Sequence, residues 1–73
     1  MTTDDMLALL KSMQPGTAGA MIKNTDLVAA DIPGIAEHDL DARAKWLVSQ
    51  LPFKCEYHSA RSTLDYVFKR ADG

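Results

Sequence analysis

Only one cysteine, Cys55, occurs in the chain, and this scarcity excludes an intramolecular disulfide. A structural zinc ion needs about four ligands. Cys55, His38 and His58 fall short of that number, and no Cys-x-x-Cys pair is present. We therefore expect no metal site and no other cofactor, and we expect a reducing, cytoplasmic setting.

Long hydrophobic runs are also absent, since every apolar stretch is far shorter than the roughly 20 residues that cross a bilayer. The chain opens with Asp4 and Asp5, whereas a secretory signal would open with basic residues. No internal repeat, low-complexity tract or glycine-rich phosphate loop is present. The lack of a long apolar run and of a basic signal segment argues against a membrane partner.

The length of 73 residues predicts one domain over residues 1–73, with residues 1–3 and 71–73 frayed. A domain of this size buries roughly 60% of the surface of its unfolded chain, so it cannot also enclose a deep pocket for a small-molecule substrate. Cys55 and His58 would point to opposite faces of one strand and cannot form a nucleophile–base pair. We predict that the protein is not an enzyme.

The net charge of −2 conceals a division along the chain. Residues 1–41 carry two basic and seven acidic residues, a net charge of −5. Residues 42–73 carry six basic and three acidic residues, a net charge of +3. A basic half of this kind favours a face directed at an anionic partner, although chance clustering on a solvated surface would give the same counts.

A first short helix is expected after Thr3, its predicted N-cap, with Asp4 and Asp5 in the first turn. Pro15-Gly16 ends this helix. Its apolar stripe at helical spacing, expected to serve the core, consists of Met6, Leu9, Leu10 and Met13.

The next segment is harder to assign, because residues 17–22 fit either a helical turn or an extended connector. Thr25 is expected to cap a second helix from Asp26 to Asp31. Pro33-Gly34 then breaks the chain.

A third and longer helix is predicted from Asp39 to Leu51, ended by Pro52. Its core face consists of Leu40, Ala44, Leu47, Val48 and Leu51. Trp46 projects away from that face. Its role is either to cover the edge of the core or to anchor a protein interface, where tryptophan and arginine are enriched.

After Pro52 the apolar period changes from 3.6 to 2, which predicts an antiparallel hairpin over Phe53–Arg70 with a link at residues 59–62. The inward residues are expected to be Phe53, Cys55, Tyr57, Leu64, Tyr66 and Phe68. Pairing Tyr57 with Leu64 would set two acids opposite each other. We prefer the register that pairs Tyr57 with Tyr66, which places His58 opposite Asp65.

The predicted fold class is therefore α+β, with about three helices followed by a C-terminal antiparallel β-hairpin. This order resembles the winged helix-turn-helix family over about Asp4 to Arg70. Residues 25–34 correspond to the family's second helix and turn, and residues 42–51 correspond to its recognition helix, which runs into the hairpin, or wing. The chain departs from the family where the third helix opens with the acids Glu37, Asp39 and Asp41, which would repel phosphates.

The resemblance implies binding through helix 39–51 and the basic hairpin. The candidate binding residues for a nucleic acid or another partner are Arg43, Lys45, Trp46, Gln50, Lys54, His58, Arg61, Lys69 and Arg70. In a DNA complex, Arg43 would read guanine edges, while Lys45, Lys54 and Arg61 would meet phosphates. Alternatively, Arg43 and Lys45 form i, i+4 pairs with Asp39 and Asp41 within the helix.

The functional expectation is a small transcription regulator that binds a macromolecule, with nucleic acid as the first choice and a homodimer if DNA is bound. The alternative is an adaptor or inhibitor that binds a protein of the transcription machinery. Small size and charge polarity are also similar to those of phage-encoded regulators that bind RNA polymerase directly. The acidic opening of the third helix favours protein, and the basic wing favours DNA.

Overall fold

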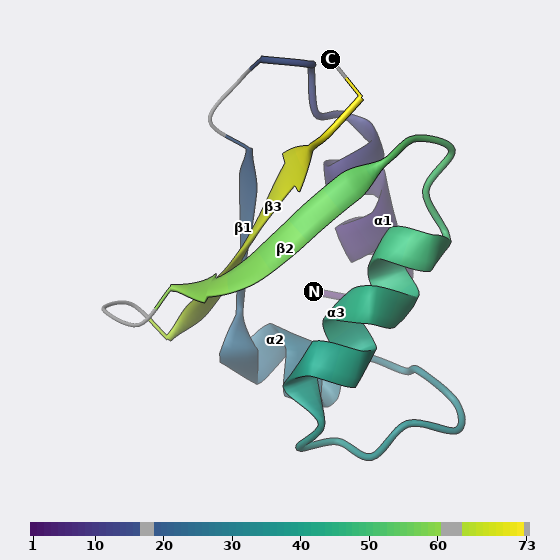
Figure 1. Cartoon of the computed structure of the whole chain (residues 1–73). Helices are drawn as coiled ribbons and strands as arrows, with labels where there is room; N and C mark the ends of the chain where they lie inside the picture. Colours follow the sequence, from purple (N-terminus) through teal and green to yellow (C-terminus); the bar gives the residue numbers. More distant parts are fainter. Residues whose placement is uncertain (17–18, 61–63, 73) are drawn as a thin grey trace.

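The chain folds as a small α+β structure with three helices and one antiparallel sheet of three strands (Figure 1). The computed structural model describes residues 1–16, 19–60 and 64–72. In chain order, the elements are α1 (Thr3–Lys11), β1 (Ala20–Lys23), α2 (Asn24–Ala29), α3 (Leu40–Ser49), β2 (Cys55–Ala60) and β3 (Asp65–Arg70). The predicted α+β class is confirmed.

The sheet is more than the predicted C-terminal hairpin, because β1 pairs with β3 and gives the strand order β1-β3-β2. Strand β1 comes from the segment for which the sequence left helix and extended chain open. Ala20 and Ile22 are buried, whereas Met21 and Lys23 are exposed. Four residues are too few for this alternation to be distinguished from a helical turn in the sequence.

Helix α1 begins one residue earlier than predicted, since Thr2 rather than Thr3 is its N-cap. The Thr2 hydroxyl accepts a bond from the amide of Asp5 at 3.1 Å, and the Asp5 carboxylate accepts one from the amide of Thr2 at 3.2 Å. This capping box satisfies two amides that a helix start leaves without partners. Met6, Leu10 and Met13 are buried as predicted, and Leu9 is half-buried.

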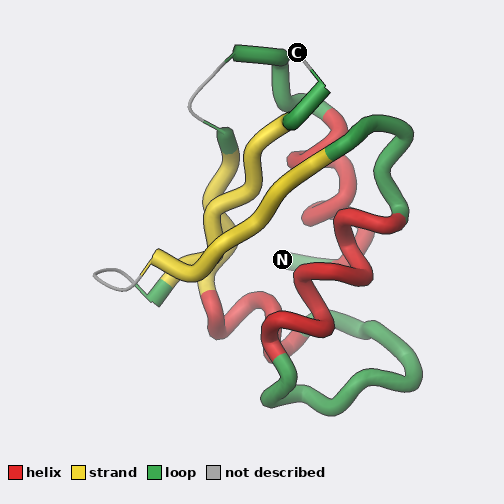
Figure 2. Tube along the Cα trace, in the orientation of Figure 1, coloured by secondary structure: helices red, strands yellow, loops and turns green. Residues whose placement is uncertain are grey.

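Helix α2 lies two residues earlier than predicted, and α3 is shorter than predicted at both ends. A long loop joins the two helices (Figure 2). Helix α2 begins directly after β1, so Thr25 lies within it and does not cap it. Asp39 is the N-cap of α3, and its side chain accepts a bond from the amide of Ala42 at 3.3 Å.

The hairpin register is also different from both registers considered, because Tyr57 lies opposite Phe68 and His58 opposite Val67. The observed register places Glu56 opposite Lys69, which are of opposite charge. Cross-strand charge pairing therefore agrees with this register as well. The link without glycine gave no turn type that could have selected it.

Leu64 was expected to face inward, and this prediction was wrong. It precedes β3, its side chain is 75% exposed, and its backbone has a φ of 55°. That left-handed conformation costs a leucine roughly 1–2 kcal/mol. The carbonyl of Leu64 accepts a bond from the amide of Asn24 at 3.0 Å, which extends the pairing of β1 and β3 toward the wing.

The core lies between one face of the sheet and the three helices, which gather along that face (Figure 1). Its fully buried side chains are Met6, Leu10, Ile22, Leu27, Leu47 and Phe68. The rings of Tyr66 and Phe68 both lie against that of Tyr57, with centroids 6.4 and 6.2 Å away. The alternation of apolar residues in β3 therefore does predict its inward face correctly from Tyr66 onward.

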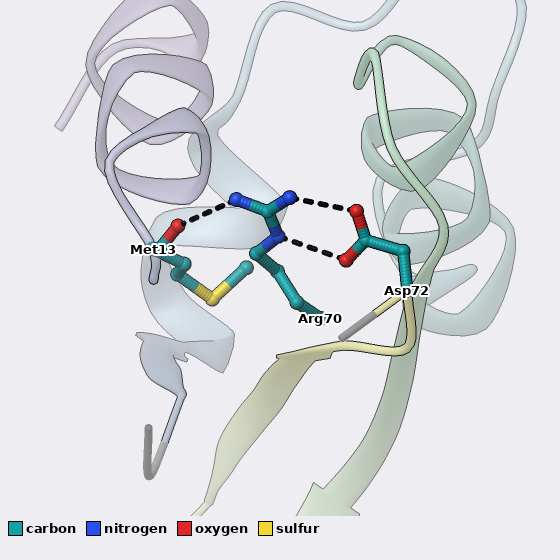
Figure 3. A network of polar contacts seen from close by, with 3 residues as sticks. All are labelled: Met13, Arg70 and Asp72. Atoms are coloured by element: carbon teal, nitrogen blue, oxygen red, sulfur yellow. Dashed lines mark hydrogen bonds and ion pairs between the residues drawn. The ribbon is translucent and has the colours of Figure 1, made fainter. Parts of the chain in front are cut away.

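The C-terminal residues were expected to be frayed, but Ala71 and Asp72 make specific contacts. The amide of Ala71 donates to the carbonyl of Lys54 at 2.8 Å. The Arg70 guanidinium binds both oxygens of Asp72, at 2.9 and 2.6 Å, and the carbonyl of Met13 at 3.2 Å (Figure 3). The end of β3 is thereby tied to the end of α1.

Gly19 is the position where the backbone leaves no room for a side chain. Its φ is +93°, and a Cβ atom would lie 2.3 Å from the carbonyl oxygen of Phe68. We predict that Gly19→Ala lowers the free energy of unfolding by more than about 3 kcal/mol, because left-handed strain and a backbone clash add.

Gly34→Ala is the matched control, since Gly34 has a φ of +80° but no atom near a new Cβ. It should cost only the strain of about 1–2 kcal/mol. Urea denaturation of both variants measures the difference, and equal losses would show that the clash at Gly19 relaxes at no cost.

Candidate binding surface

Arg43, the residue predicted to read guanine edges, lies in the interior with only 2% of its surface exposed. Its Nε donates to the carbonyl of Leu27 at 2.7 Å, and its Nη1 donates to the carbonyls of Ile35 and Ala36 at 3.0 and 3.3 Å. Its Nη2 donates to the carbonyl of Ala30. The prediction of a DNA or partner contact at Arg43 was therefore wrong.

The position of Arg43 in the helix explains its burial. Leu40, Arg43, Ala44 and Leu47 follow the i, i+3, i+4, i+7 spacing of one helix face. That face is directed at α2 and at the loop after it, where backbone carbonyls accept the hydrogen bonds of Arg43. The spacing was a signal in the sequence, but an arginine in a basic half was interpreted as a surface charge. The proposed Asp39–Arg43 pair does not form either.

The other candidates on α3 lie at different depths. Lys45 and Gln50 are exposed, and the Gln50 amide donates to the Ser49 hydroxyl at 3.2 Å. Trp46 is half-buried and packs against the core, as one of its two predicted roles requires. Among the described residues, no ion pair joins Asp41 to Lys45.

The hairpin candidates are spread along its length. Lys54 precedes β2 and Lys69 lies near the end of β3, so both lie at the end of the hairpin away from the β2–β3 connection. His58 is midway along β2. All three are exposed. Arg61 lies outside the described residues.

Arg70 is half-buried and already engaged. Besides its bonds to Asp72 and Met13, its guanidinium carbon lies 4.1 Å above the ring centroid of Phe53. The hydrogen bonds between Arg70 and Asp72 lower the pKa of the Asp72 carboxyl and raise the pKa of the Arg70 guanidinium. The predicted basic residues that the structure describes therefore do not converge on one patch, because Arg43 is buried, Arg70 is paired, and the lysines are dispersed.

The surface near the start of α3 is acidic, as the sequence indicated. Glu37, Asp39 and Asp41 are all exposed there. On the sheet, Lys69 and Lys23 lie opposite Glu56 and Asp65 in the strand register. Lys23 and Lys69 thus have acids beside them, which reduces the field that each presents to an anion.

Asp41 also holds the sheet to α3, a role that the sequence did not indicate. The Tyr66 hydroxyl donates a hydrogen bond to the Asp41 carboxylate. Burial of the ring, and then the bond to Asp41, raise the pKa of Tyr66 to about 12. Tyrosine and aspartate are therefore locked together across the interface between β3 and α3.

Among the residues that the structure describes, the groups relevant to catalysis or metal binding include the buried Cys55 thiol and the possible metal ligands. Burial raises the pKa of the Cys55 thiol, which favours its protonated form. No three His, Cys, Asp or Glu side chains among the described residues are grouped to hold a metal ion. Within the same residues, no helix has the length and apolar character needed to cross a bilayer.

Two open hollows mark the surface. One, of about 420 Å³, lies where β1 meets α2 and is lined by Lys23, Asn24, Thr25, Leu64 and Asp65. The other, of about 410 Å³, lies between the start of α1 and α3 and is lined by Thr2, Thr3, Asp4, Leu7, Asp31 and Trp46. The half-buried Trp46 thus lines the same hollow as the acidic residues Asp4 and Asp31.

Comparison of the chain with protein-family models, with curated proteins and with solved structures found no match.

The buried guanidinium predicts a large loss of stability when it is removed. Arg43→Met should lower the free energy of unfolding by about 3–5 kcal/mol, because four carbonyls of α2 and its loop each lose a charge-assisted hydrogen bond. Arg43→Lys should retain only part of the stability that Arg43→Met loses, since an ammonium group lacks the planar set of donors of a guanidinium. Lys45→Met, on the exposed face of the same helix, should change stability by less than about 0.5 kcal/mol. Urea denaturation distinguishes these, and a loss below about 1 kcal/mol at Arg43 would contradict the assigned role.

The Tyr66–Asp41 bond predicts a dependence of stability on alkaline pH. The folded pKa of about 12 is above the unfolded value of 10.0, so the unfolded chain loses the proton first. The stabilisation is complete below about pH 10 and is lost as the pH rises toward 12. Because other groups titrate there, the measurement is the difference in urea midpoint between wild type and Tyr66→Phe. The wild-type advantage should shrink between pH 10 and 12, and a constant difference would refute the linkage.

Proposed function

We propose that this protein is a small regulator of the winged helix-turn-helix type that acts by binding a protein of the transcription machinery. The observation that carries the choice of protein over DNA is the burial of Arg43. The helix in the recognition position has no other arginine, and this one is bonded to four carbonyls of its own chain.

The order of elements supports the winged-helix part of the proposal. A strand between the first two helices pairs with the last strand, and α3 leads directly into the hairpin β2–β3. This order is similar to that of a helix-turn-helix followed by a wing. The link to transcription rests on that resemblance.

The surface charge supports a protein partner. The described exposed face of α3 and its approach carry Lys45 against three acids. Duplex DNA would bring a row of phosphates against those acids, at an energetic cost that Lys45 alone does not offset. A protein with a basic or amphipathic surface meets no such penalty.

Nucleic acid is the second candidate, because Lys45, Lys54 and Lys69 are exposed and their side chains make no hydrogen bond or ion pair within the described residues. Three dispersed lysines are sufficient only for weak, salt-sensitive attachment to phosphates. In that case a dimer or a larger complex would be needed for useful affinity.

The two candidates are separated by parallel binding experiments. With random duplex DNA at about 50 mM salt, we expect a Kd weaker than about 100 μM. With purified bacterial RNA polymerase, we expect co-elution in size-exclusion chromatography that persists at about 200 mM salt. Micromolar affinity for DNA that falls steeply with salt would replace the proposal by the second candidate. Absence of both interactions would overturn the assignment to the transcription machinery.

The matched variants are Lys45→Ala and Lys11→Ala, which each remove one exposed lysine, from α3 and from the far end of α1 respectively. If DNA were the target, only Lys45→Ala would weaken retardation and lower its salt dependence by about one phosphate contact. If the partner is a protein that does not contact Lys45, the two variants should show the same retardation of DNA and the same binding to that protein.

A further inference from the structure

Two of the residues that line the hollow between α1 and α3 are apolar or aromatic. They are Trp46 and Leu7, which are half-buried and packed against the core, and we call them the floor of the hollow. Such side chains offer contact area without losing much conformational freedom when a partner binds. Tryptophan and arginine are also the residues most enriched at interface hot spots.

Two other lining residues are acidic, Asp4 and Asp31, and we call them the rim of the hollow. Both are exposed, and neither makes a side-chain hydrogen bond or ion pair within the described part of the chain. None of the residues that line the hollow is basic. By contrast, the carboxylate of the neighbouring Asp5 is occupied by the capping box with Thr2.

The walls of the hollow are held in place before any partner arrives. The capping box fixes the first turn of α1. The Thr3 hydroxyl donates to the carbonyl of Asp31 at 3.2 Å and so ties the start of α1 to the chain after α2. A depression with fixed walls costs less to fill than one that must be ordered on binding.

We propose that this hollow receives an arginine or lysine side chain from a basic segment of the protein partner. The cation would lie against the Trp46 ring and between two free carboxylates, which combines cation–π attraction with opposite charge. Charge complementarity selects this occupant, because phosphate or an acidic peptide would be repelled by Asp4 and Asp31. The proposal rests on the proposed function only in that the partner is a protein.

Trp46 is the only tryptophan of the chain and therefore reports on the site directly. The probe is the blocked peptide Ac-Gly-Arg-Arg-Gly-NH₂, and its control replaces both arginines by citrulline, a neutral side chain of similar shape. We expect a saturable change of tryptophan emission with the arginine peptide in the submillimolar to millimolar range. The change should be weaker with citrulline and should decrease between about 50 and 500 mM salt.

The variant that tests the rim is the double change Asp4→Asn and Asp31→Asn, which keeps the shape of the hollow. It should lower the affinity for the arginine peptide about fivefold, as expected for the loss of two exposed charge pairs. Glu37→Gln is the matched control, because it removes an exposed acid that does not line the hollow. Urea midpoints measured in parallel confirm that all variants are folded.

Several outcomes would overturn the assignment. These are an equal response to the citrulline peptide, unchanged affinity in the double variant, or no response up to about 10 mM peptide. Emission that changes with protein concentration alone would show that a second copy fills the hollow. If RNA polymerase still binds the double variant with unchanged affinity, the hollow is wrong while the protein-binding function stands. Micromolar DNA binding would refute the function independently of the peptide result.

Discussion

The hydrogen bonds of the Arg43 guanidinium are the interaction on which the arrangement of the helices depends. One side chain from α3 satisfies carbonyls at the end of α2 and in the loop that follows it. Without that donor, each of these carbonyls would lose a charge-assisted hydrogen bond, and that of Ile35 would lose the one donor that it has among the described residues. No carboxylate of the described residues pairs with the guanidinium, so its charge is balanced by backbone dipoles. The angle between α2 and α3 is therefore fixed by a polar contact as well as by apolar packing.

Using the arginine internally changes what the surface can bind. The basic half counted from the sequence includes Arg43 and Arg70, but the first is buried and the second binds Asp72 and Met13. Among the described residues of that half, the exposed basic side chains are Lys45, Lys54 and Lys69, and Lys69 faces Glu56 across the strands. A net charge of +3 in residues 42–73 is thus no guide to the field outside the molecule, since position decides which charges reach a partner.

Strong periodicity made parts of this fold predictable from the sequence, and its absence hid the rest. The stripes that begin at Met6 and Leu40 identified α1 and α3, and the alternation through Phe68 identified the final strand. Strand β1 is too short to show a period, and the hairpin link has no residue that dictates its turn. Arg43 was misassigned because its residue type outweighed its spacing, although it follows the same stripe as Leu40 and Ala44. The acidic hollow was beyond prediction, since it joins residues that are distant in the sequence.

The hollow shows why Trp46 could not be assigned to a single role. The sequence posed a choice between covering the core and anchoring a partner, and the half-buried ring is placed to do both. A side chain with both roles cannot be removed without disturbing the packing of the core. The carboxylates of Asp4 and Asp31 have no such packing role, because they are exposed and make no bond within the described residues. Stability therefore depends on the floor of this surface, and selectivity for a cation depends on its rim.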